Sequence, residues 1–380
     1  MMHKLILAFA LLGQLLVAGF CYGGGGGEAV GSSPAASQPV GLTPQQLGVV
    51  INDADPNSVE VGEYYIQARN IPQENVVRVN IPGKPRKIDA QQFAQLKAAV
   101  EAGFGPNVQA MVLVWTAPYM VNCNSITSAL TMGLDAAQCR NTCGAGKPNP
   151  YYSSNSNQPY SDYRMRISML LPADSVSQAK ALIQRGLISG FRHEAGSAYL
   201  LITADKARNS RARFFPRPMF VRDAKLMIKP MRANSIENEK DVMFYLTGLP
   251  TVTKLDTLEF LPGALADHLT SFGGDLLGEQ QMSSLRWLEA GATASYGTVS
   301  EPCGHWQKFP HPLVMIKSYL SGYSAVETYW KSVQWPAQGL VIGEPLAAPY
   351  RHLAKSKTAE SQEIKAEEIQ PKEIEAESSD

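Results

Sequence analysis

The sequence predicts an α/β protein whose mostly parallel sheet is covered by helices on both faces. Of its 380 residues 44% are hydrophobic, so the chain can bury a large core in one domain, with or without an added lobe. Short apolar runs alternate with segments whose apolar residues recur at helical spacing. The connections between these segments are short, which is typical of strands joined by crossover helices.

The first half of the domain reads as strand, helix, strand, helix, strand. Apolar runs predict strands at residues 47–51, 76–81 and 110–115. Apolar residues at helical spacing predict helices at residues 58–70 and 88–102. Ser58 and Asp89 are available to cap the first turns of these helices.

The second half repeats this alternation. Its patterns predict helices at residues 179–188 and 282–289, and strands at 168–171, 198–203, 242–246, 258–261, 292–299 and 340–342. Strands that alternate with helices favour a parallel sheet, with the polypeptide crossing one face or the other between strands.

Two long excursions interrupt the alternation. Residues 121–163 are rich in Asn, Ser, Tyr and Gly, and a loop of this length inside a domain is usually functional or stapled. Residues 206–232 carry nine basic residues against Asp223 alone. This second excursion is either a solvated surface loop or an anion-binding face, and both interpretations stay open.

The two ends of the chain are predicted to lie outside the domain, which covers residues 45–353. Lys4, the apolar run at 5–18 and the small residues after it form an export-signal pattern, expected at residues 1–23. Residues 24–44 are rich in Gly, Ser, Pro and Ala and are expected to be a flexible linker. Residues 354–380 are expected to be a disordered charged tail.

The export signal predicts where the protein acts. Its apolar run is too short to span a bilayer, so no transmembrane span is expected in the mature protein, which is predicted to be periplasmic or extracellular. Phe20 precedes Cys21 where a lipoprotein signal carries a small residue, so a lipid anchor is disfavoured. The formal net charge is zero and exported proteins rarely meet nucleic acid, so no nucleic-acid partner is expected.

Four cysteines follow the signal region, and their even number predicts two disulfides in an oxidising compartment. These are Cys123, Cys139, Cys143 and Cys303, and their spacing does not choose among the three pairings. A zinc site is disfavoured because no histidine lies between the first three. The sequence also lacks P-loop, GxSxG, HExxH and GxGxxG motifs, so no metal or cofactor is expected.

The segment from residue 258 to 303 is the predicted functional site. It reads as strand, Gly-rich loop, helix, strand and acidic turn. In a parallel sheet the loops that leave the carboxyl ends of strands form the ligand crevice. Such loops are expected to hold Asp267, His268, Ser271, Glu301 and Cys303.

His268 is the strongest catalytic candidate in this segment. A histidine beside the carboxylate of Asp267 can act as a general base, and Gly273 and Gly274 would let backbone N–H groups approach a substrate oxyanion. The alternative interpretation is a histidine whose hydrogen bonds tie down a turn. Cys303, with His305 close by in sequence, is either an activated thiol or half of a disulfide.

Two further acidic positions follow predicted strands. Asp53 and Asp55 could bind a cation or act as acid and base, or they could cap and turn into the next helix. Glu344, after the last strand, is either at the same edge as His268 or part of a structural turn only.

Six motifs follow one another along the domain from Gly48 to Pro349, each present once: VVINDADPNSVEVGEYYIQARNIP, NCNSITSAL, DHLTSFGG, GATASYGTVSEP, ETYWKSV and GEPLAAPY. Through these motifs the chain resembles a family of exported bacterial proteins whose activity is uncharacterised. The resemblance implies export and transfers no activity.

The order of elements and the GATASYGTV strand also resemble the caspase-like fold of gingipain-type cysteine peptidases, which implies a three-layer sandwich. In that fold a catalytic His-Gly follows one strand and the nucleophilic Cys follows the next. Leu246-Thr247-Gly248 occupies the first place here, and Asp267-His268-Leu269-Thr270 occupies the second. Neither carries the expected residue, and losing both members of the dyad removes the peptidase mechanism.

Two functional hypotheses follow. The first is a catalytically silent relative of these peptidases that binds a peptide, a glycan or another envelope component. Its expected binding residues are Asp53, Arg208, Arg211, Ser271, Gly273 and Gly274. The alternative is an exported, peptidase-like hydrolase that uses His268 with Asp267, Glu301 or Cys303. A free Cys303 favours the hydrolase, whereas a bridged Cys303 favours binding.

Overall fold

The first half of the domain forms the predicted alternation of strands and helices. Its elements are β1 (Leu47–Asn52), α1 (Pro56–Arg69), β2 (Val76–Val79), α2 (Ala90–Gly103) and β4 (Ala110–Val114). Asp55 starts α1 by accepting a hydrogen bond from the Asn57 amide, and Asn70 ends it in a left-handed conformation with φ 52°. Asp89 starts α2 by accepting from the amides of Gln91 and Gln92.

The computed structural model describes residues 40–190 and 195–354, which all lie in one compact unit. The predicted export signal, the linker up to residue 39 and the tail from residue 355 lie outside these residues. Leu42 is already buried, and its amide donates to Glu327 at 3.0 Å, so packing begins before residue 45.

The second half follows the predicted alternation up to α7 and then adds two helices that the sequence patterns missed. In chain order its elements are β7 (Ile167–Leu171), α6 (Val176–Ile188), β8 (Gly196–Ile202), β11 (Val242–Thr247), β12 (Phe260–His268), α7 (Leu285–Glu289), β13 (Ala294–Thr298), α8 (Pro312–Leu320), α9 (Ala325–Ser332) and β14 (Gly339–Gly343). The missed helices are α8 and α9.

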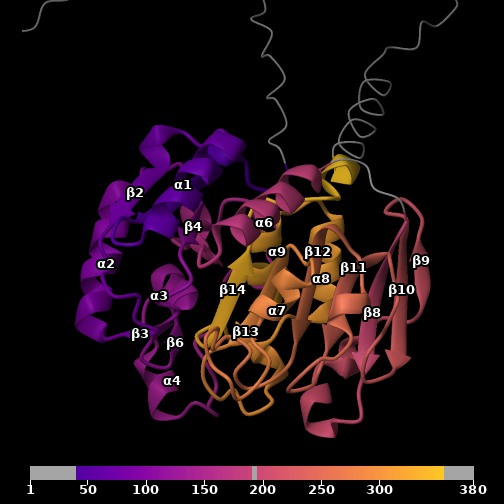
Figure 1. The fold of residues 1–380 in the computed structure, drawn as a ribbon. Coiled ribbons are helices and arrows are strands. Elements are labelled where there is room, and N and C mark those ends of the chain that lie inside the picture. The colour runs from indigo at the N-terminus through magenta and orange to yellow at the C-terminus, as the bar shows by residue number, and fades with distance from the viewer. Residues whose placement is uncertain (1–39, 191–194, 355–380) are drawn as a thin grey trace, which may run out of the picture. The chain divides into compact units, whose positions relative to one another are not determined.

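The main sheet has 11 strands in the order β2-β1-β4-β7-β14-β13-β12-β11-β8-β10-β9 (Figure 1). The strands from β2 to β14 pair in parallel, and so do those from β13 to β10. The two parallel blocks meet at an antiparallel pair, in which Ala294 of β13 lies opposite Gly343 of β14. The carboxyl ends of one block therefore lie at the opposite edge of the sheet from those of the other.

Helices cover both faces of this sheet, as the sequence predicts. In β1 a side chain at Gly48 would meet Phe104 at the end of α2, whereas Ile51 packs against Gly62 of α1. Positions three apart on a strand point to opposite faces, so α1 and α2 lie on different faces. In the other block Ala266 of β12 belongs to the hydrophobic cluster of Trp287 in α7, whereas its neighbour Leu265 belongs to the cluster of Tyr329 in α9, so these helices cover opposite faces.

The excursion at residues 121–163 is folded rather than irregular. With its flanks it contains β5 (Met120–Val121), β6 (Asn124–Ser125), α3 (Ile126–Met132), α4 (Ala136–Arg140) and α5 (Pro159–Tyr163). A small second sheet joins β5 and β6 to β3 (Lys87–Ile88). The two expected bridges are formed: Cys123–Cys139 closes a loop within this segment, and Cys143–Cys303 joins the segment to the loop after β13.

The basic excursion at residues 206–232, for which the sequence predicts a surface loop or an anion-binding face, contains two strands that extend the sheet. It forms β9 (Met219–Val221) and β10 (Leu226–Arg232), and β10 pairs in parallel with β8. Leu226 and Ile228 are buried while Met227 between them is exposed, so the strand alternates as a half-buried strand should. Prolines and charges scattered through the segment masked this alternation in the sequence.

The strand predicted at residues 258–261 is longer than expected. Gly263 has φ 90°, and the register between β11 and β12 shifts at this point, which marks a β-bulge. The bulge carries the strand past Pro262, so β12 runs on to His268. Asp267 and His268 therefore lie inside a strand, and the prediction that they lie in a loop is wrong.

None of the helices in residues 40–190 and 195–354 has the length and apolar character that a membrane span requires.

Candidate functional site

The predicted crevice lies where β12 and β13 end. These strands are parallel neighbours, so their carboxyl ends meet at one edge of the sheet. We call the edge formed by the carboxyl ends of β8, β11, β12 and β13 the β12 edge. The carboxyl ends of β1, β4, β7 and β14 form the opposite edge, which we call the β7 edge.

Most of the predicted site residues lie at the β12 edge, and two acidic candidates do not. Asp53 follows β1 and Glu344 follows β14, so both lie at the β7 edge. Asp53 pairs with Arg78 at 2.7 Å on the surface. Glu344 is buried and accepts hydrogen bonds from Tyr65 and Arg69. Neither carboxylate shares a site with His268, because the two parallel blocks point in opposite directions.

Asp267 and His268 cannot work as a pair because they point to opposite faces of the sheet. They are adjacent in β12, where successive side chains alternate between faces. Asp267 forms a buried ion pair with Arg211. Arg211 also donates from Nη2 to the carbonyl oxygen of Thr247 at 2.9 Å. Burial raises the pKa of Asp267, and the nearby Arg211 opposes that shift.

His268 lies on the α7 face with both ring nitrogens occupied. Its Nδ1 accepts a hydrogen bond from Trp287 Nε1 at 2.9 Å, so Nε2 must carry the proton. That Nε2 donates to the carbonyl oxygen of Met282 at 2.9 Å. Burial lowers the pKa of His268 to about 4, although the Met282 bond opposes this shift. A neutral imidazole held in this way has no free lone pair with which to accept a substrate proton.

The two glycines after β12 serve close packing instead of an oxyanion hole. The Gly274 amide donates to the carbonyl oxygen of Thr298 at 2.9 Å, so it is not free for a ligand. A Cβ on Gly274 would lie 2.4 Å from the Gly297 carbonyl oxygen, so only glycine fits against β13. At Gly273 the nearest atom to such a Cβ is 3.3 Å away, on the His268 ring. Ser271 lies beside them and accepts from Thr298 through its carbonyl oxygen at 2.9 Å.

Cys303 is bonded to Cys143, so it presents no thiol at this edge. The expected dyad of His268 with Cys303 is not formed, since His268 is bonded to Trp287 and Met282. The Cys303 amide donates to Glu301 Oε1 at 2.7 Å, so Glu301 shapes the turn that carries the disulfide.

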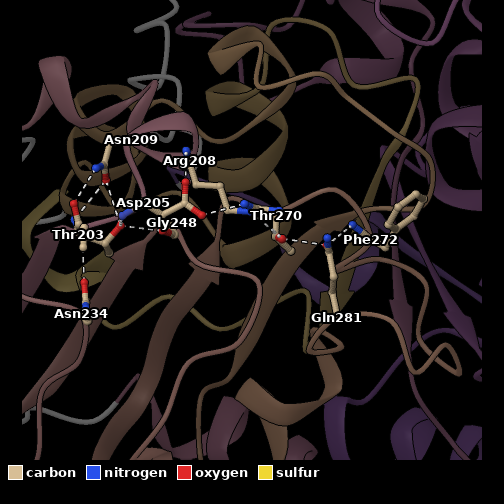
Figure 2. Close-up of polar contacts among 10 residues, drawn as sticks. Thr203, Asp205, Arg208, Asn209, Asn234, Gly248, Thr270, Phe272 and Gln281 are labelled. Carbon is tan, nitrogen blue, oxygen red and sulfur yellow. Dashed lines mark hydrogen bonds and ion pairs between the residues drawn. The ribbon is translucent and has the colours of Figure 1, made fainter.

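A chain of hydrogen bonds joins the loops of the β12 edge (Figure 2). Arg208 donates to Asp205 at 2.6 Å and to Thr270 Oγ1 at 3.2 Å. Thr270 donates in turn to Gln281 Oε1 at 2.7 Å, and this oxygen also accepts from the Phe272 amide at 2.8 Å.

A second set of bonds ties the loop after β8 to its neighbours. Thr203 donates to the Gly248 carbonyl oxygen at 2.8 Å and Asn234 accepts from the Ala204 amide at 2.8 Å. Thr203, Gln281 and Asn234 are not among the site residues that the sequence predicts. The sequence does offer one signal for this network. Thr203 and Thr270 follow the ends of β8 and β12, where threonine hydroxyl groups often form hydrogen bonds with loop amides and carbonyls.

An open groove of about 640 Å³ borders this edge, between the loops that follow β11 and β12. Gln281 and Met282 form part of it, so the groove lies directly over the loop that holds His268. The lining mixes small apolar patches with charges of both signs: Thr251, Val252, Lys254, Leu255, Asp256, Gly278, Glu279, Gln280, Gln281, Met282, Ser283 and Arg286.

Metal chemistry has no cluster to support it here. Among the described residues, no group of three or more His, Cys, Asp or Glu side chains is arranged to hold an ion. The imidazole and carboxylates of the predicted site are instead held by Trp287, Arg211 and backbone groups.

No protein-family model matches the chain, and no curated protein matches it. Two solved structures are similar to it. One, described as "Structure of Protease", has 12% identity and a TM-score of 0.44, over 83% of this chain and 80% of that chain. The other, "Crystal structure of the Arg specific cysteine proteinase gingipain R (RGPB)", has 11% identity and a TM-score of 0.40, over 82% of this chain and 80% of that one. At these values the likeness carries no activity or residue role to this chain.

Proposed function

We propose that this protein is a binding protein that holds a peptide in the groove of the β12 edge and performs no hydrolysis there. The observation that carries this proposal is the state of the reactive side chains. The histidine, the cysteine and the buried aspartate of the predicted site are each engaged by another protein group.

Hydrolysis by a thiol or hydroxyl nucleophile needs a base within hydrogen-bond reach and donors for the oxyanion. His268 is neutral and donates to Met282, while Cys303 Sγ is bonded to Cys143. The Gly274 amide, a candidate oxyanion donor, is bonded to Thr298. Each component of the mechanism is therefore occupied by the fold itself, which supports a binding role.

The groove favours a peptide over a glycan. Sugars bind well where their C–H faces stack on aromatic rings, and none of the residues that line the groove is aromatic. The lining instead alternates apolar Val252 and Leu255 with charged Lys254 and Asp256. Such a mixture matches the varied side chains of an extended peptide.

A groove-blocking substitution tests the site directly. Thr251 and Thr253 are both exposed in the same loop, but only Thr251 lines the groove. Thr251→Trp should abolish capture of peptides selected from a random library on the wild-type protein, and Thr253→Trp should retain it. Equal binding by the two variants, or selection of no peptide at all, would contradict the proposal. If a parallel screen selects glycans whose binding is lost in Thr251→Trp, the ligand of the groove is a glycan and not a peptide.

The hydrolase alternative has its own test. Mild reduction frees Cys303, so cleavage of a peptide library should be measured with and without reductant on the full chain. We expect no cleavage in either state. Cleavage that appears on reduction and disappears in Cys303→Ala or His268→Ala would establish the hydrolase.

Export is a further part of the proposal. The signal pattern at residues 1–23 and the two disulfides support an oxidising compartment, as does the resemblance to exported bacterial proteins. Fractionation of cells that express the full chain should place it outside the cytoplasm. An alkylating reagent should label Cys123, Cys139, Cys143 and Cys303 only after the protein has been reduced.

A further inference from the structure

A second cavity lies at the opposite edge of the sheet, between α6 and α7. Its volume is about 480 Å³, within the range of roughly 300–1,000 Å³ that accommodates small molecules. The loops after β4 and β7 close one end of it, through Thr116 and Pro172. Apolar side chains of the two helices dominate its lining: Ala179, Leu182, Leu285 and Leu288. We call it the α6–α7 cavity.

Arg185 is the cation of this cavity, and most of its guanidinium has no partner. Its Nη2 donates to the carbonyl oxygens of Leu288 at 2.9 Å and Ala292 at 3.1 Å, which fixes the side chain against the end of α7. Within residues 40–190 and 195–354, Nη1 makes no hydrogen bond, Nε is buried without a partner, and no carboxylate lies within 4.0 Å. Burial lowers the pKa of Arg185, with no nearby charge to oppose that shift.

Two acidic residues, Asp174 and Glu289, also line the cavity, but neither forms an ion pair with Arg185. Glu289 forms an ion pair with Arg286. Asp174 is about half exposed and lies 4.0 Å from Lys84. The cavity therefore holds apolar walls and a partly buried cation that no carboxylate of the described residues approaches within 4.0 Å, which leaves its charge locally unbalanced. Buried charges in proteins are normally paired, so this imbalance points to an anion from outside the chain.

We propose that the α6–α7 cavity binds a small amphiphilic carboxylate, with its carboxylate on Arg185 and its apolar body along α6. The planar guanidinium matches a carboxylate, and its unused Nη1 hydrogens are the donors for it. The stretch of α6 from its cap at Ser175 to Arg185 is about 15 Å long at 1.5 Å per residue, which suits an elongated apolar chain.

This site is independent of the peptide groove. The α6–α7 cavity borders the β7 edge, whereas Thr251 and Gln281 line a groove at the β12 edge. Failure of peptide binding would therefore leave the carboxylate site untouched, and loss of carboxylate binding would leave the peptide groove intact.

Three probes distinguish the contribution of the ligand's charge to affinity from that of its apolar chain. Binding of decanoate, decanol and acetate to the full chain is measured by calorimetry at neutral pH. Decanoate should bind roughly tenfold or more tightly than decanol, because a charge-assisted hydrogen bond to a partly buried arginine is lost in the alcohol. Acetate should bind more weakly than decanoate, because it buries little apolar surface. Equal affinity for decanoate and decanol would overturn the proposal, as would the absence of decanoate binding.

Substitutions then assign the binding to this cavity. Arg185→Met should remove the preference for decanoate over decanol, and Arg185→Lys should keep part of it. Ala181 lines the cavity and is exposed on α6, so Ala181→Trp should block both probes while leaving Arg185 in place. Ala98→Trp, at an exposed position on α2, is the matched control and should bind as the wild type does. Decanoate binding that survives in both Ala181→Trp and Arg185→Met would place the ligand elsewhere and end the proposal.

Discussion

The two edges of the main sheet use their polar residues in opposite ways. At the β12 edge the reactive side chains are numerous, but each is bonded within the protein: His268 to Trp287, Asp267 to Arg211, and Cys303 to Cys143. At the β7 edge the α6–α7 cavity is open and Arg185 lacks an anionic partner among the described residues. The difference teaches that reactive residue types at a strand end do not make an active site. A polar side chain that lacks hydrogen-bond partners and borders an open cavity is the better indicator of a ligand-binding site.

The comparison predicts that substitutions of the buried polar residues at the β12 edge lower stability, whereas substitutions in the α6–α7 cavity lower the binding of its ligand. The largest stability effect is expected for Arg211→Met. It leaves the Asp267 carboxylate buried without its cation, which should lower the free energy of unfolding by about 3–5 kcal/mol. Urea denaturation at neutral pH measures this loss.

Arg208→Met is the matched control, because Arg208 pairs with Asp205 at the same edge but is partly exposed. It should cost about 1 kcal/mol or less. A loss for Arg211→Met no larger than that for Arg208→Met would show that the buried pair is not what holds this edge together.

Removal of the Cys143–Cys303 bridge should have the next largest effect. The double variant Cys143→Ala, Cys303→Ala should lose about 2–4 kcal/mol of unfolding free energy, because this bridge closes a long loop in the unfolded chain. The bridge spans 160 residues, whereas Cys123–Cys139 spans 16, so its removal should cost more than removal of the shorter bridge. The reverse order, in matched denaturation curves, would contradict the role of the long bridge as the main staple of the edge.

The two glycines after β12 give a close-range comparison. Gly274→Ala should cost about 1–3 kcal/mol, because its Cβ would lie 2.4 Å from the Gly297 carbonyl oxygen and the backbone must shift. Gly273→Ala should cost less, since the nearest contact to its Cβ is 3.3 Å away. Equal thermal stability of the two variants would mean that the approach of this loop to β13 is not restrictive.

The smallest effect concerns pH. His268 has a folded pKa of about 4, below the ordinary value of 6.5, so between these values the unfolded chain binds the extra proton. Stability from this group is therefore full above pH 6.5 and falls as the pH drops toward 4. Between pH 7 and 5.5 the wild type should lose about 1 kcal/mol more than His268→Gln, which has no such titration. Parallel pH profiles for the two proteins would show that His268 does not titrate abnormally.

Much of the fold was predictable because its strands are buried on both faces. Residues 47–51 and 110–115 are continuous apolar runs bounded by turn residues, and they form β1 and β4 close to the expected limits. Capping residues such as Asp89 marked the helix starts through local hydrogen bonds. By contrast, Pro262-Gly263 looked like the end of a strand, although a bulge carries β12 through it. A bulge depends on the register of the neighbouring strand, which local sequence does not contain.

The sequence predicted where the loops of the candidate site lie, but not how the side chains there are oriented and bonded. That the loops after residues 268 and 298 share an edge follows from two parallel neighbours, and the structure bears it out. That Asp267 and His268 point to opposite faces follows only once both are known to lie in β12. The importance of Arg185 was invisible, because nothing in the sequence around α6 indicates that α7 packs beside it and leaves a cavity.

By itself the sequence determined the alternation of strands and helices, the even set of cysteines and the residues that follow each strand, because these depend on local apolar patterning and capping. Only the tertiary structure decided that the two parallel blocks meet in opposite directions, that Cys143 finds Cys303, and that Trp287 and Arg211 occupy the would-be catalytic groups. These outcomes depend on which distant segments lie side by side. Such contacts are set by the packing of the whole core, and no single stretch of sequence encodes them.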